Sequence, residues 1–405
     1  MEEPASASTR SADAWSVTSG GRLLDLIRTG RARTRRDLLE LTGLSRSTVA
    51  TRVDQLVSAG YLRESSLRET GARGRPSTVL AFNERHGLVL SADVGATHAR
   101  AMLSDLAGVC LGETARSLRI SDGLHECLEW LQAAWRRMLR DAGPELPPVV
   151  GIGVGIPGPV DVRTGRPVRL PIMPGWHDHP VRERLEDAFG VPAFVENDAN
   201  LMALGEFSVA APECPSLLFI KVATGIGAGM VVDGHLVRGV NGGSGDIGHV
   251  RVTSTDDGPV CACGARGCLA ASASGGAISR HLAEAGAPAS TSREAMDLAH
   301  RGDPLAVSLV RSSGLQIGEV LATAVSLINP GVLVVGGDVT RAQEHFMPAL
   351  KERLFQRTQP LATRDLRVTT SDLGDRAGVA GGVALVVEEI YSAGSVDRAL
   401  ATRAC

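Results

Sequence analysis

Four side chains that could bind a metal lie close together in the middle of this 405-residue sequence. His249 is followed by Cys261, Cys263 and Cys268, and two glycines between the last two cysteines permit a tight turn. Three thiolates and one imidazole form a complete tetrahedral set for Zn²⁺ and leave no position for water. We therefore predict a closed, structural zinc site. The alternative is three reduced, buried cysteines beside an unrelated histidine.

Glycine-containing turns that could hold a phosphate follow three short apolar runs, at Asp93–His98, Thr224–Gly229 and Val335–Asp338. Backbone amides in such turns can approach an anion closely because glycine has no side chain. Each turn alone is also ordinary between the strands and helices of an α/β protein, so only their combination favours a nucleotide site. The candidate nucleotide-binding residues are Asp93, Gly95, Thr97, Thr224, Gly225, Gly227, Gly336 and Gly337.

A basic segment near the N-terminus could bind a polyanion. Residues 22–83 contain twelve Arg against six Asp or Glu, although the whole chain has a net charge of −3. Three helices at short spacing, followed by a charged hairpin over 61–82, predict a winged helix-turn-helix. Ser45 can cap the third helix, whose apolar residues repeat at helical spacing until Gly60.

The third helix is the element that we expect to read DNA. Its first residues, Ser45 to Thr48, lie at the end that reaches base edges in helix-turn-helix proteins. Nearby arginines suit phosphate contacts, and the arm over 73–76 suits an A·T-rich minor groove. The candidate DNA-binding residues are Arg35, Arg36, Ser45, Arg46, Ser47, Thr48, Thr51, Arg52, Arg73 and Arg75. The alternative is a three-helix bundle with a solvated arginine face.

After about residue 86 the texture of the sequence changes. Short apolar runs with β-branched residues alternate with helical stretches, which indicates an α/β fold. The expected strands are 88–93, 149–155, 193–196, 217–222 and 332–336. Glycine-containing turns follow these strands, which is where α/β proteins place their ligands.

Motifs between about residues 85 and 390 resemble the ROK family (repressors, open reading frames and sugar kinases). The segment Gly248-His249 … Cys261–Leu269 is similar to a signature of that family, and Gly153–Gly158 and Glu196–Asn200 lie between the glycine turns. The resemblance implies a two-lobed, actin-like ATPase fold with ribonuclease-H-like halves, as in sugar kinases. The N-terminal winged helix-turn-helix resembles the repressor branch, because the kinases lack it.

The resemblance divides the chain into parts. We expect a disordered tail over 1–19, a winged helix-turn-helix DNA-binding domain over 20–83, a first lobe over 84–198 completed by a helix at about 375–391, a second lobe with the zinc loop over 199–374, and a flexible tail over 392–405. The ligand pocket would then lie in the cleft between the two lobes.

The resemblance also implies a sugar pocket. Asp198 would be the general base that takes a proton from the sugar hydroxyl, and a carboxylate can both orient and activate that hydroxyl. His249 would place one nitrogen on zinc and the other near the sugar. The implied sugar-binding residues are Asn197, Asp198, Asp246 and His249, with Asp198 catalytic only if the chain is an active kinase.

Several positions depart from the kinase pattern. In the first glycine turn, Ala96 replaces glycine and His98 replaces lysine, and a methyl group would crowd a backbone that must approach phosphate. Asp246 is one methylene shorter than the usual glutamate, and Ala270 replaces a second glutamate. Asp338 adds a negative charge near the expected adenosine. The nucleotide site is therefore expected to be degenerate, with ATP and Mg²⁺ needed only if kinase activity survives.

These observations favour a sugar-responsive DNA-binding transcription regulator, with repression as the expected mode. It would bind a double-stranded DNA operator as a homodimer or tetramer and respond to a sugar or sugar phosphate. One alternative is an active ATP-dependent, glucokinase-like sugar kinase fused to a DNA-binding domain. Another is a DNA-bound structural protein whose second domain only dimerises. The sequence has no secretory signal and no apolar run of membrane-spanning length, so we expect a cytoplasmic protein that does not bind membranes.

Overall fold

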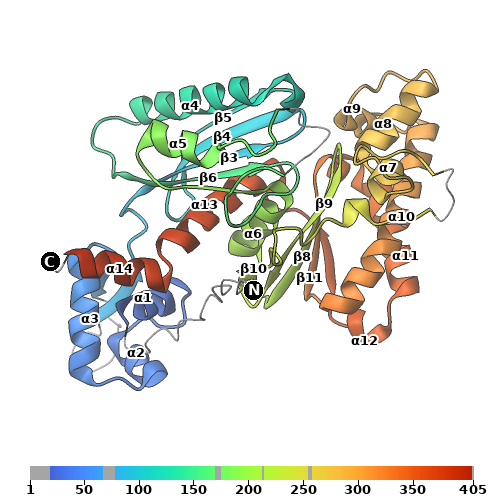
Figure 1. The fold of residues 1–405 in the computed structure, drawn as a ribbon. Coiled ribbons are helices and arrows are strands. Elements are labelled where there is room, and N and C mark those ends of the chain that lie inside the picture. Colours follow the sequence, from blue (N-terminus) through green and yellow to red (C-terminus); the bar gives the residue numbers. More distant parts are fainter. Residues whose placement is uncertain (1–18, 67–77, 169–174, 212–213, 254–257, 404–405) are drawn as a thin grey trace, which may run out of the picture. The chain divides into compact units, whose positions relative to one another are not determined.

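The computed structural model describes residues 19–66, 78–168, 175–211, 214–253 and 258–403. The chain forms two compact units, one from residues 1–87 with 387–405 and one from residues 88–386. Figure 1 labels the helices and strands of both units. The tail expected over 1–19 lies outside the described residues, apart from Ser19.

The smaller unit begins with three helices and a two-stranded antiparallel sheet, in the predicted order. The elements are α1 (Gly20–Arg28), α2 (Arg35–Thr42), α3 (Arg46–Ser58), β1 (Leu62–Ser66) and β2 (Thr78–Phe82). The side chains of Thr34 and Ser45 cap α2 and α3, because each accepts a backbone N–H from the first turn of its helix. Gly43 ends α2 in the left-handed conformation, with φ of 67°.

The C-terminal segment is a helix, and the prediction of a flexible tail over 392–405 is therefore wrong for the described part. Helix α14 (Ala393–Arg403) packs against α1, where the backbone N–H of Gly21 donates to Asp397 at 2.8 Å. A Cβ atom on Gly21 would lie 2.1 Å from the carbonyl oxygen of Ala393, so only glycine permits this approach. The segment is polar, and its packing depends on a glycine that is distant in sequence, so no local pattern revealed it.

The larger unit contains two five-stranded sheets of the same topology, with strand orders β5-β4-β3-β6-β7 and β10-β9-β8-β11-β12. Three strands in each sheet are antiparallel neighbours, and the last two add in parallel. The strands are β3 (Leu88–Val94), β4 (His98–Asp105), β5 (Cys110–Ser117), β6 (Val149–Ile156), β7 (Ala193–Asn197), β8 (Ser216–Val222), β9 (Ile226–Val232), β10 (His235–Leu236), β11 (Val332–Gly336) and β12 (Arg367–Thr370). The two sheets give the two-lobed α/β architecture that the sequence predicted.

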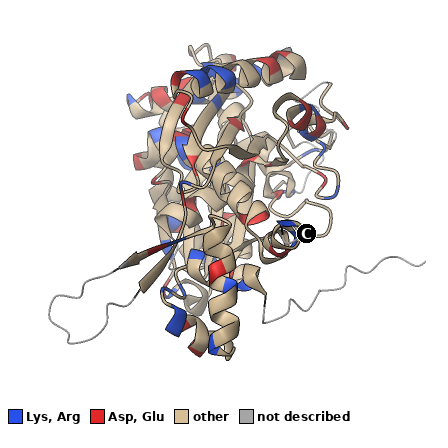
Figure 2. Cartoon of the chain, turned by 90° about the vertical axis from the view of Figure 1, so that its left-hand side faces the viewer, with Lys and Arg blue, Asp and Glu red and all other residues tan. Residues whose placement is uncertain are grey.

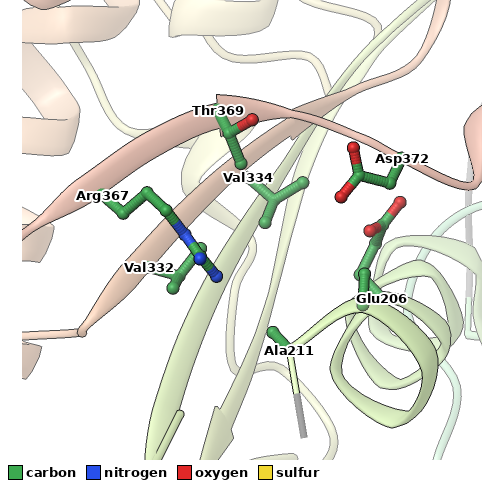
Figure 3. A pocket seen from close by; sticks show the side chains of 8 residues that line it. Glu206, Ala211, Val332, Val334, Arg367, Thr369 and Asp372 are labelled. Carbon is green, nitrogen blue, oxygen red and sulfur yellow. The ribbon is translucent and has the colours of Figure 1, made fainter. Parts of the chain in front are cut away.

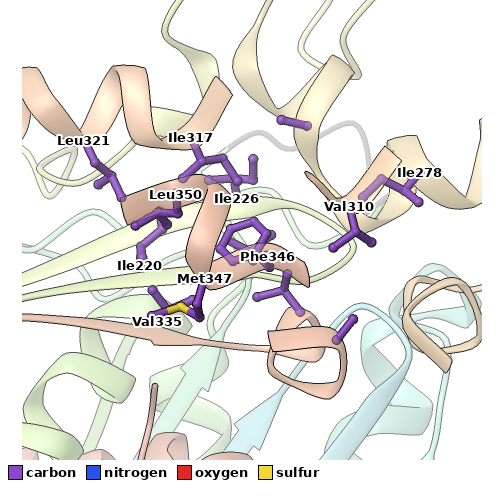
Figure 4. Packing of buried hydrophobic residues seen from close by; sticks show 14 of the residues in the cluster. Ile220, Ile226, Ile278, Val310, Ile317, Leu321, Val335, Phe346, Met347 and Leu350 are labelled. Atoms are coloured by element: carbon purple, nitrogen blue, oxygen red, sulfur yellow. The ribbon is translucent and has the colours of Figure 1, made fainter. Parts of the chain in front are cut away.

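Helices cover each sheet and form its core. The first sheet packs against α4 (Leu124–Asp141) and α5 (Val181–Phe189), with Trp135 and Trp176 almost fully buried. Figure 4 shows the core of the second sheet, where Ile220 of β8 lies among helical side chains. The helices around this second sheet are α7 (Leu269–Ala273), α8 (Gly275–Glu284), α9 (Ser292–His300), α10 (Pro304–Ile328), α11 (Gln343–Arg357) and α12 (Pro360–Thr363).

Helix α6 (Asp198–Ala210) belongs to both cores of the larger unit. Leu201 and Leu204 pack in one apolar cluster, while Met202 and Ala203 pack in another with residues of the second sheet. The first part of α13 (Ala377–Ile390) approaches α6 through glycine: a Cβ on Gly381 would lie 1.8 Å from the Leu201 carbonyl oxygen. Because α6 starts at Asp198, the fold fixes this residue rigidly at the boundary between the two sheets.

The five predicted strands are confirmed as β3, β6, β7, β8 and β11, within a residue or so at each end. The antiparallel strands β4, β5 and β9 and the short β10 and β12 were not predicted. Among the described residues, no single helix is long and apolar enough to cross a membrane. The consecutive helices α13 and α14 meet that test of length and composition only as a bent pair.

Candidate functional site

The four predicted metal ligands lie in one cluster. The ligating atoms of His249, Cys261, Cys263 and Cys268 are all within 4.8 Å of one another. The Cys261 sulfur lies 3.5 Å from His249 Nδ1, and the Cys263 and Cys268 sulfurs are 3.8 Å apart. Zn–S bonds of about 2.3 Å at tetrahedral angles place two sulfurs roughly 3.8 Å apart. Both the donor set and its spacing therefore fit zinc.

The outer nitrogen of His249 faces a carboxylate. Its Nε2 lies 3.8 Å from Oδ1 of Asp246, whose side chain is 48% exposed. A carboxylate at the outer nitrogen of a metal-bound histidine orients the ring and raises its basicity. The turn before Asp246 is fixed by Gly245, which has φ of 89° and leaves no room for a Cβ beside the Ala228 carbonyl oxygen. The structure thus joins two of the implied sugar ligands to the metal cluster.

Asp198, the implied general base, is buried and already engaged on both oxygens. Its Oδ1 accepts the backbone N–H of Ala199 at 2.7 Å, and its Oδ2 is paired with the ammonium of Lys221 on β8. Burial lowers the pKa of the Lys221 ammonium, but the carboxylates of Asp198 and Asp93 outweigh this effect and hold that pKa above its ordinary value. The amine of Lys221 therefore stays charged beside Asp198.

The sequence reasoning missed Lys221 as a site residue. It is one of two lysines in the chain, the other being Lys351, whereas the chain has 40 arginines. A lysine within an otherwise apolar strand, β8, was the available signal, because a buried ammonium needs a buried partner.

The two residues before Asp198 are also held by the protein itself. The Asn197 side chain caps α6 by accepting the Asn200 backbone N–H at 3.1 Å, and it donates to the Gly158 carbonyl oxygen at 3.0 Å. Glu196 is buried and accepts from Arg238 Nε at 2.6 Å. Asn197 thus has a structural role as helix cap, besides the sugar contact that the sequence implied.

The first glycine turn is covered by its own histidine. The backbone N–H of Gly95 donates to the carbonyl oxygen of His98 at 2.8 Å. A Cβ atom on Gly95 would lie 2.4 Å from the His98 ring, so the imidazole rests directly against the glycine. Thr97 is exposed, whereas Asp93 is only 1% exposed. The backbone amide that would approach a phosphate is therefore occupied and shielded within the chain.

Asp93 is the first residue of this turn, and its carboxylate, like that of Asp198, interacts electrostatically with the Lys221 ammonium. Its Oδ2 is 3.8 Å from His98 Nε2, and its Oδ1 has no hydrogen-bond partner although it is buried. Burial favours the neutral acid, but His98 and Lys221 together hold the pKa of Asp93 below its ordinary value. Asp93 is consequently an ionised carboxylate in the protein interior.

The other two glycine turns serve mainly for close packing. Thr224 and Gly225 are exposed at the tip of the β8–β9 hairpin, and Gly225 faces open space. Gly227 packs against α6, with its Cβ direction 3.4 Å from Ala199. Gly336 and Gly337 pack against β8: added Cβ atoms would lie 2.3 Å from the Phe219 ring and 2.6 Å from the Val222 carbonyl oxygen. Of the predicted nucleotide residues here, only the hairpin tip is open to a ligand.

A series of ion pairs involves Asp338, at the end of the third glycine turn. Asp338, only 15% exposed at its side chain, lies 3.5 Å from Arg293 of α9. Arg293 also lies 3.4 Å from Asp375, and Arg100 of β4 lies 3.8 Å from the same carboxylate. The negative charge that the sequence placed at Asp338 is thus neutralised by a cation of the protein.

A cavity of about 130 Å³ lies apart from these residues, beside β11 and β12 (Figure 3). In Figure 3 the carboxylates of Glu206 and Asp372 lie on one side of this cavity and the Arg367 guanidinium on another. Glu206 is buried and accepts the Leu373 backbone N–H at 3.0 Å as well as the Ser371 hydroxyl. Its carboxylate therefore anchors the chain after β12, and none of the predicted site residues lines this cavity.

The smaller unit presents the predicted recognition helix. Val49, Val53 and Leu56 of α3 are buried, whereas Ser45, Arg46 and Ser47 are exposed and Thr48 is partly exposed. The Ser45 hydroxyl caps the helix by accepting the Thr48 backbone N–H at 3.1 Å. Arg46 has no ion-pair partner among the described residues. The Ser45 hydroxyl also lies 2.9 Å from the Ser47 hydroxyl and 2.8 Å from the Thr48 hydroxyl, so it is the exposed Arg46 side chain that is open to a partner here.

The predicted arginines of this unit differ in their surroundings. Arg35 pairs with Asp54 at 2.7 Å and with Glu64, so it ties α2 to α3 and β1. Arg36 is well exposed and pairs only with Glu40, one helical turn away. Arg52 is partly exposed, and Thr51 is exposed. In Figure 2, where Lys and Arg are blue, basic positions occur along the helices of this unit. Arg73 and Arg75 lie outside the described residues.

Comparisons with known proteins cover both units. Residues 89–389 match the ROK family, and residues 22–63 match a winged helix-turn-helix DNA-binding domain. The xylose repressor of Caldicellulosiruptor bescii is 27% identical over 373 residues, which are 88% of this chain and 92% of the repressor. The glucokinase of Thermotoga maritima is 30% identical over 317 residues, which are 75% of this chain and 98% of the kinase.

Solved structures show the same division. A crystal structure described as a ROK family transcriptional regulator, homologous to the Escherichia coli Mlc protein, covers 94% of this chain and 98% of its own, with a TM-score of 0.78 and 25% identity. A ROK hexokinase from Thermus thermophilus covers 75% of this chain and 99% of its own, with a TM-score of 0.62 and 34% identity. The regulators match nearly the whole chain, whereas the kinases match three quarters of it.

Proposed function

We propose that this chain, which belongs to the ROK family, is a sugar-responsive DNA-binding transcription regulator that acts as a repressor. The observation that carries the proposal is that one chain combines an exposed recognition-helix N-terminus with a kinase-type cleft whose general base is paired to a lysine. Relatives named as repressors align over nearly the whole chain, which supports the same conclusion. The protein acts in the cytoplasm, where operator DNA is present and cysteines stay reduced.

The smaller unit binds the operator. The first turn of α3, from Ser45 to Thr48, enters the major groove, where Arg46 can pair bidentately with guanine and the hydroxyls adapt to several acceptors. Arg36 and Arg52 contact phosphates, and Arg35 mainly holds the unit together through Asp54 and Glu64. A homodimer presents two such helices to two half-sites of one operator.

The larger unit binds the effector. Asn197, Asp198, Asp246 and His249 supply oxygens and a nitrogen that hydrogen-bond the hydroxyl groups of a sugar or sugar derivative. A structural Zn²⁺ held by His249 and the three cysteines keeps the imidazole and its loop at the edge of the pocket. Effector binding weakens operator binding, and by linkage the operator weakens effector binding by the same factor.

Two measurements on the full chain test this proposal. Selection from fragmented genomic DNA, followed by fluorescence anisotropy on an enriched duplex and a scrambled duplex, should reveal sequence-selective binding at moderate salt. Calorimetry with a panel of sugars and sugar phosphates should identify one that binds and lowers the operator affinity. Equal retention of both duplexes would overturn the regulator, and a panel without any binding sugar would overturn the sensing function.

An active sugar kinase is the second candidate, because 317 residues align with a glucokinase at 30% identity and Asp198 is kept. A coupled ADP-release assay over the same sugars distinguishes the two candidates. We expect no sugar-dependent turnover, since Asp198 is held in an ion pair with Lys221 and His98 covers the first glycine turn. Sugar-dependent turnover that disappears in Asp198→Asn would favour the kinase.

A further inference from the structure

Lys221 lies between carboxylates that a kinase would need for other purposes. Its side chain is only 12% exposed and pairs with Asp198, which is 7% exposed. Asp93, 1% exposed, and Asp338 act on the same ammonium, and both raise its pKa. One internal cation therefore pairs with Asp198 and offsets part of the charge of Asp93, while Asp338 also pairs with Arg293.

The need for a cation at this place follows from the burial of Asp93 and Asp198. An added Cβ atom on Gly155 would lie 3.5 Å from both Asp93 Oδ1 and Asp198 Cα, so the two buried residues are neighbours. Burial and the charge of Asp93 raise the pKa of Asp198, so an ionised pair here needs an opposite charge or full hydrogen bonding. Asp93 Oδ1 has no hydrogen-bond partner, so this carboxylate depends on the His98 ring near its other oxygen and on the charge of Lys221. Without the ammonium, this pair would require a proton or another cation.

Phosphoryl transfer makes three demands that meet at the same place. A divalent cation must neutralise the phosphate oxygens, backbone amides must approach the phosphate, and a carboxylate must be free to orient the attacking hydroxyl. Here Lys221 supplies the cation, the Gly95 N–H donates to His98, and both Asp198 oxygens are engaged. The chain itself thus supplies the cation, occupies the backbone amide and holds the carboxylate in an ion pair, while the remaining lone pairs of Asp198 can still accept a sugar hydroxyl.

We propose that the Lys221 ammonium is a built-in cation that takes the place of a divalent metal beside Asp198 and Asp93, so that the proposed effector site needs neither metal nor nucleotide. This inference rests on the proposed function only in taking the cleft as an effector site. It predicts that removal of the ammonium uncovers a divalent-cation site formed by two buried carboxylates.

The test uses the full chain loaded with Zn²⁺, so that the cysteine cluster is already filled. Lys221→Met keeps the length of the side chain and removes its charge. We expect this variant to unfold several degrees lower than the wild type and to recover when millimolar Mn²⁺ or Mg²⁺ is added, because a ligand that binds only the folded state stabilises it. The wild type and the control Lys351→Met should not respond to these cations.

A second readout counts the ions. Electron paramagnetic resonance of Mn²⁺ should detect one more bound ion per chain in Lys221→Met than in the wild type, and the double variant Lys221→Met/Asp93→Asn should lose it. Should Lys221→Met not fold, Lys221→Gln carries the same two measurements. A folded variant without an extra Mn²⁺, or a wild type that binds Mn²⁺ together with a non-hydrolysable ATP analogue, would overturn the proposal. Neither measurement involves DNA or sugar, so failure here is distinct from failure of the proposed function.

Discussion

Two regions of this chain have the features of a phosphate-binding site, and they differ in how their polar groups are used. At the N-terminus of α3, Ser45, Arg46 and Ser47 are exposed, and Arg46 has no ion-pair partner among the described residues. In the turn after β3, the Gly95 N–H donates to the His98 carbonyl oxygen, and the His98 ring covers the glycine. The first region is open to a polyanion, whereas the second is closed by its own chain.

A motif alone therefore does not establish a binding site. A glycine turn or helix N-terminus binds an anion through backbone donors that have no other partner. Once the protein supplies that partner, the glycines can persist for packing, as Gly336 and Gly337 do against β8. Whether these donors are free or already hydrogen-bonded therefore distinguishes the proposed DNA-binding surface from the glycine turn after β3.

The largest effect is expected at the metal cluster, because three thiolates and one imidazole arranged around one point are a complete ligand set for an ion. Cys268→Ser removes one ligand. We expect the bound zinc to fall from one per chain to almost none and the free energy of unfolding to fall by several kcal/mol, since structural zinc contributes directly to folding. Elemental analysis and denaturant unfolding measure the two effects.

The matched control for this prediction is Cys110→Ser, which changes an exposed cysteine of the other sheet. It should keep both the zinc and the stability. If Cys268→Ser retained a full equivalent of zinc and unfolded with the wild type, the cluster would be no metal centre. Four ligand atoms around one point would then not indicate a bound ion.

Arg46 tests the open region directly. Replacement by alanine should weaken binding to the selected operator about 10- to 100-fold, because a bidentate pair with a base edge contributes roughly 1–3 kcal/mol of discrimination. Binding to scrambled DNA should change much less. Fluorescence anisotropy measures both, with Arg137→Ala on an exposed position of α4 as control. Equal losses on both duplexes would make Arg46 a phosphate contact instead.

Much of this fold could be predicted from local patterns. The caps at Thr34 and Ser45, the buried stripe of α3 and the apolar strands that precede glycine turns each follow from short-range rules. The antiparallel strand β5 escaped because much of it is exposed and its sequence is polar, and β4, although mostly buried, carries His98, Arg100 and Asp105 among its apolar residues. Helix α14 escaped because its packing depends on Gly21, which lies more than 370 residues earlier.

The candidate site could likewise be predicted only in part. The spacing of the cysteines identified the metal cluster, because ligand type and number determine the metal. The pairing of Asp198 with Lys221 could not be predicted, since it joins α6 of one region of the sequence to β8 of another. Likewise, no sequence pattern shows that the His98 ring turns back onto Gly95, because that depends on a side-chain conformation.

Helix α2 sharpens the comparison with α3, because its N-terminus is closed by a capping box. Thr34 accepts the Asp37 backbone N–H at 3.1 Å, and the Asp37 carboxylate accepts the Thr34 backbone N–H at 3.0 Å. Thr34→Ala should cost about 1 kcal/mol of local stability and leave operator affinity nearly unchanged. Hydrogen exchange of the α2 amides measures the first effect. A loss of affinity like that of Arg46→Ala would show that the capping box of α2 is needed for operator binding.

The smallest effect is expected for His86, which lies in an aromatic cluster of the smaller unit near the start of α14. Its ring lies edge-on to Tyr61 at 5.1 Å and to Tyr391 at 6.4 Å. Burial, and then the nearby charge of Arg403, lower the pKa of His86 below its ordinary value of 6.5. The folded state therefore prefers the neutral ring, and its contribution to stability is present above pH 6.5 and is lost as the pH falls below it.

Hydrogen exchange of the α14 amides between about pH 7.5 and 5.5 measures this dependence, after correction for the intrinsic exchange rate. Protection should decrease toward the acidic end in the wild type and become nearly independent of pH in His86→Phe, which keeps an aromatic ring without a titratable nitrogen. His125→Phe, at an exposed position of α4, should retain the wild-type slope. An unchanged slope in His86→Phe would place the pH-sensitive group elsewhere, and the docking of α14 would then not depend on a neutral imidazole.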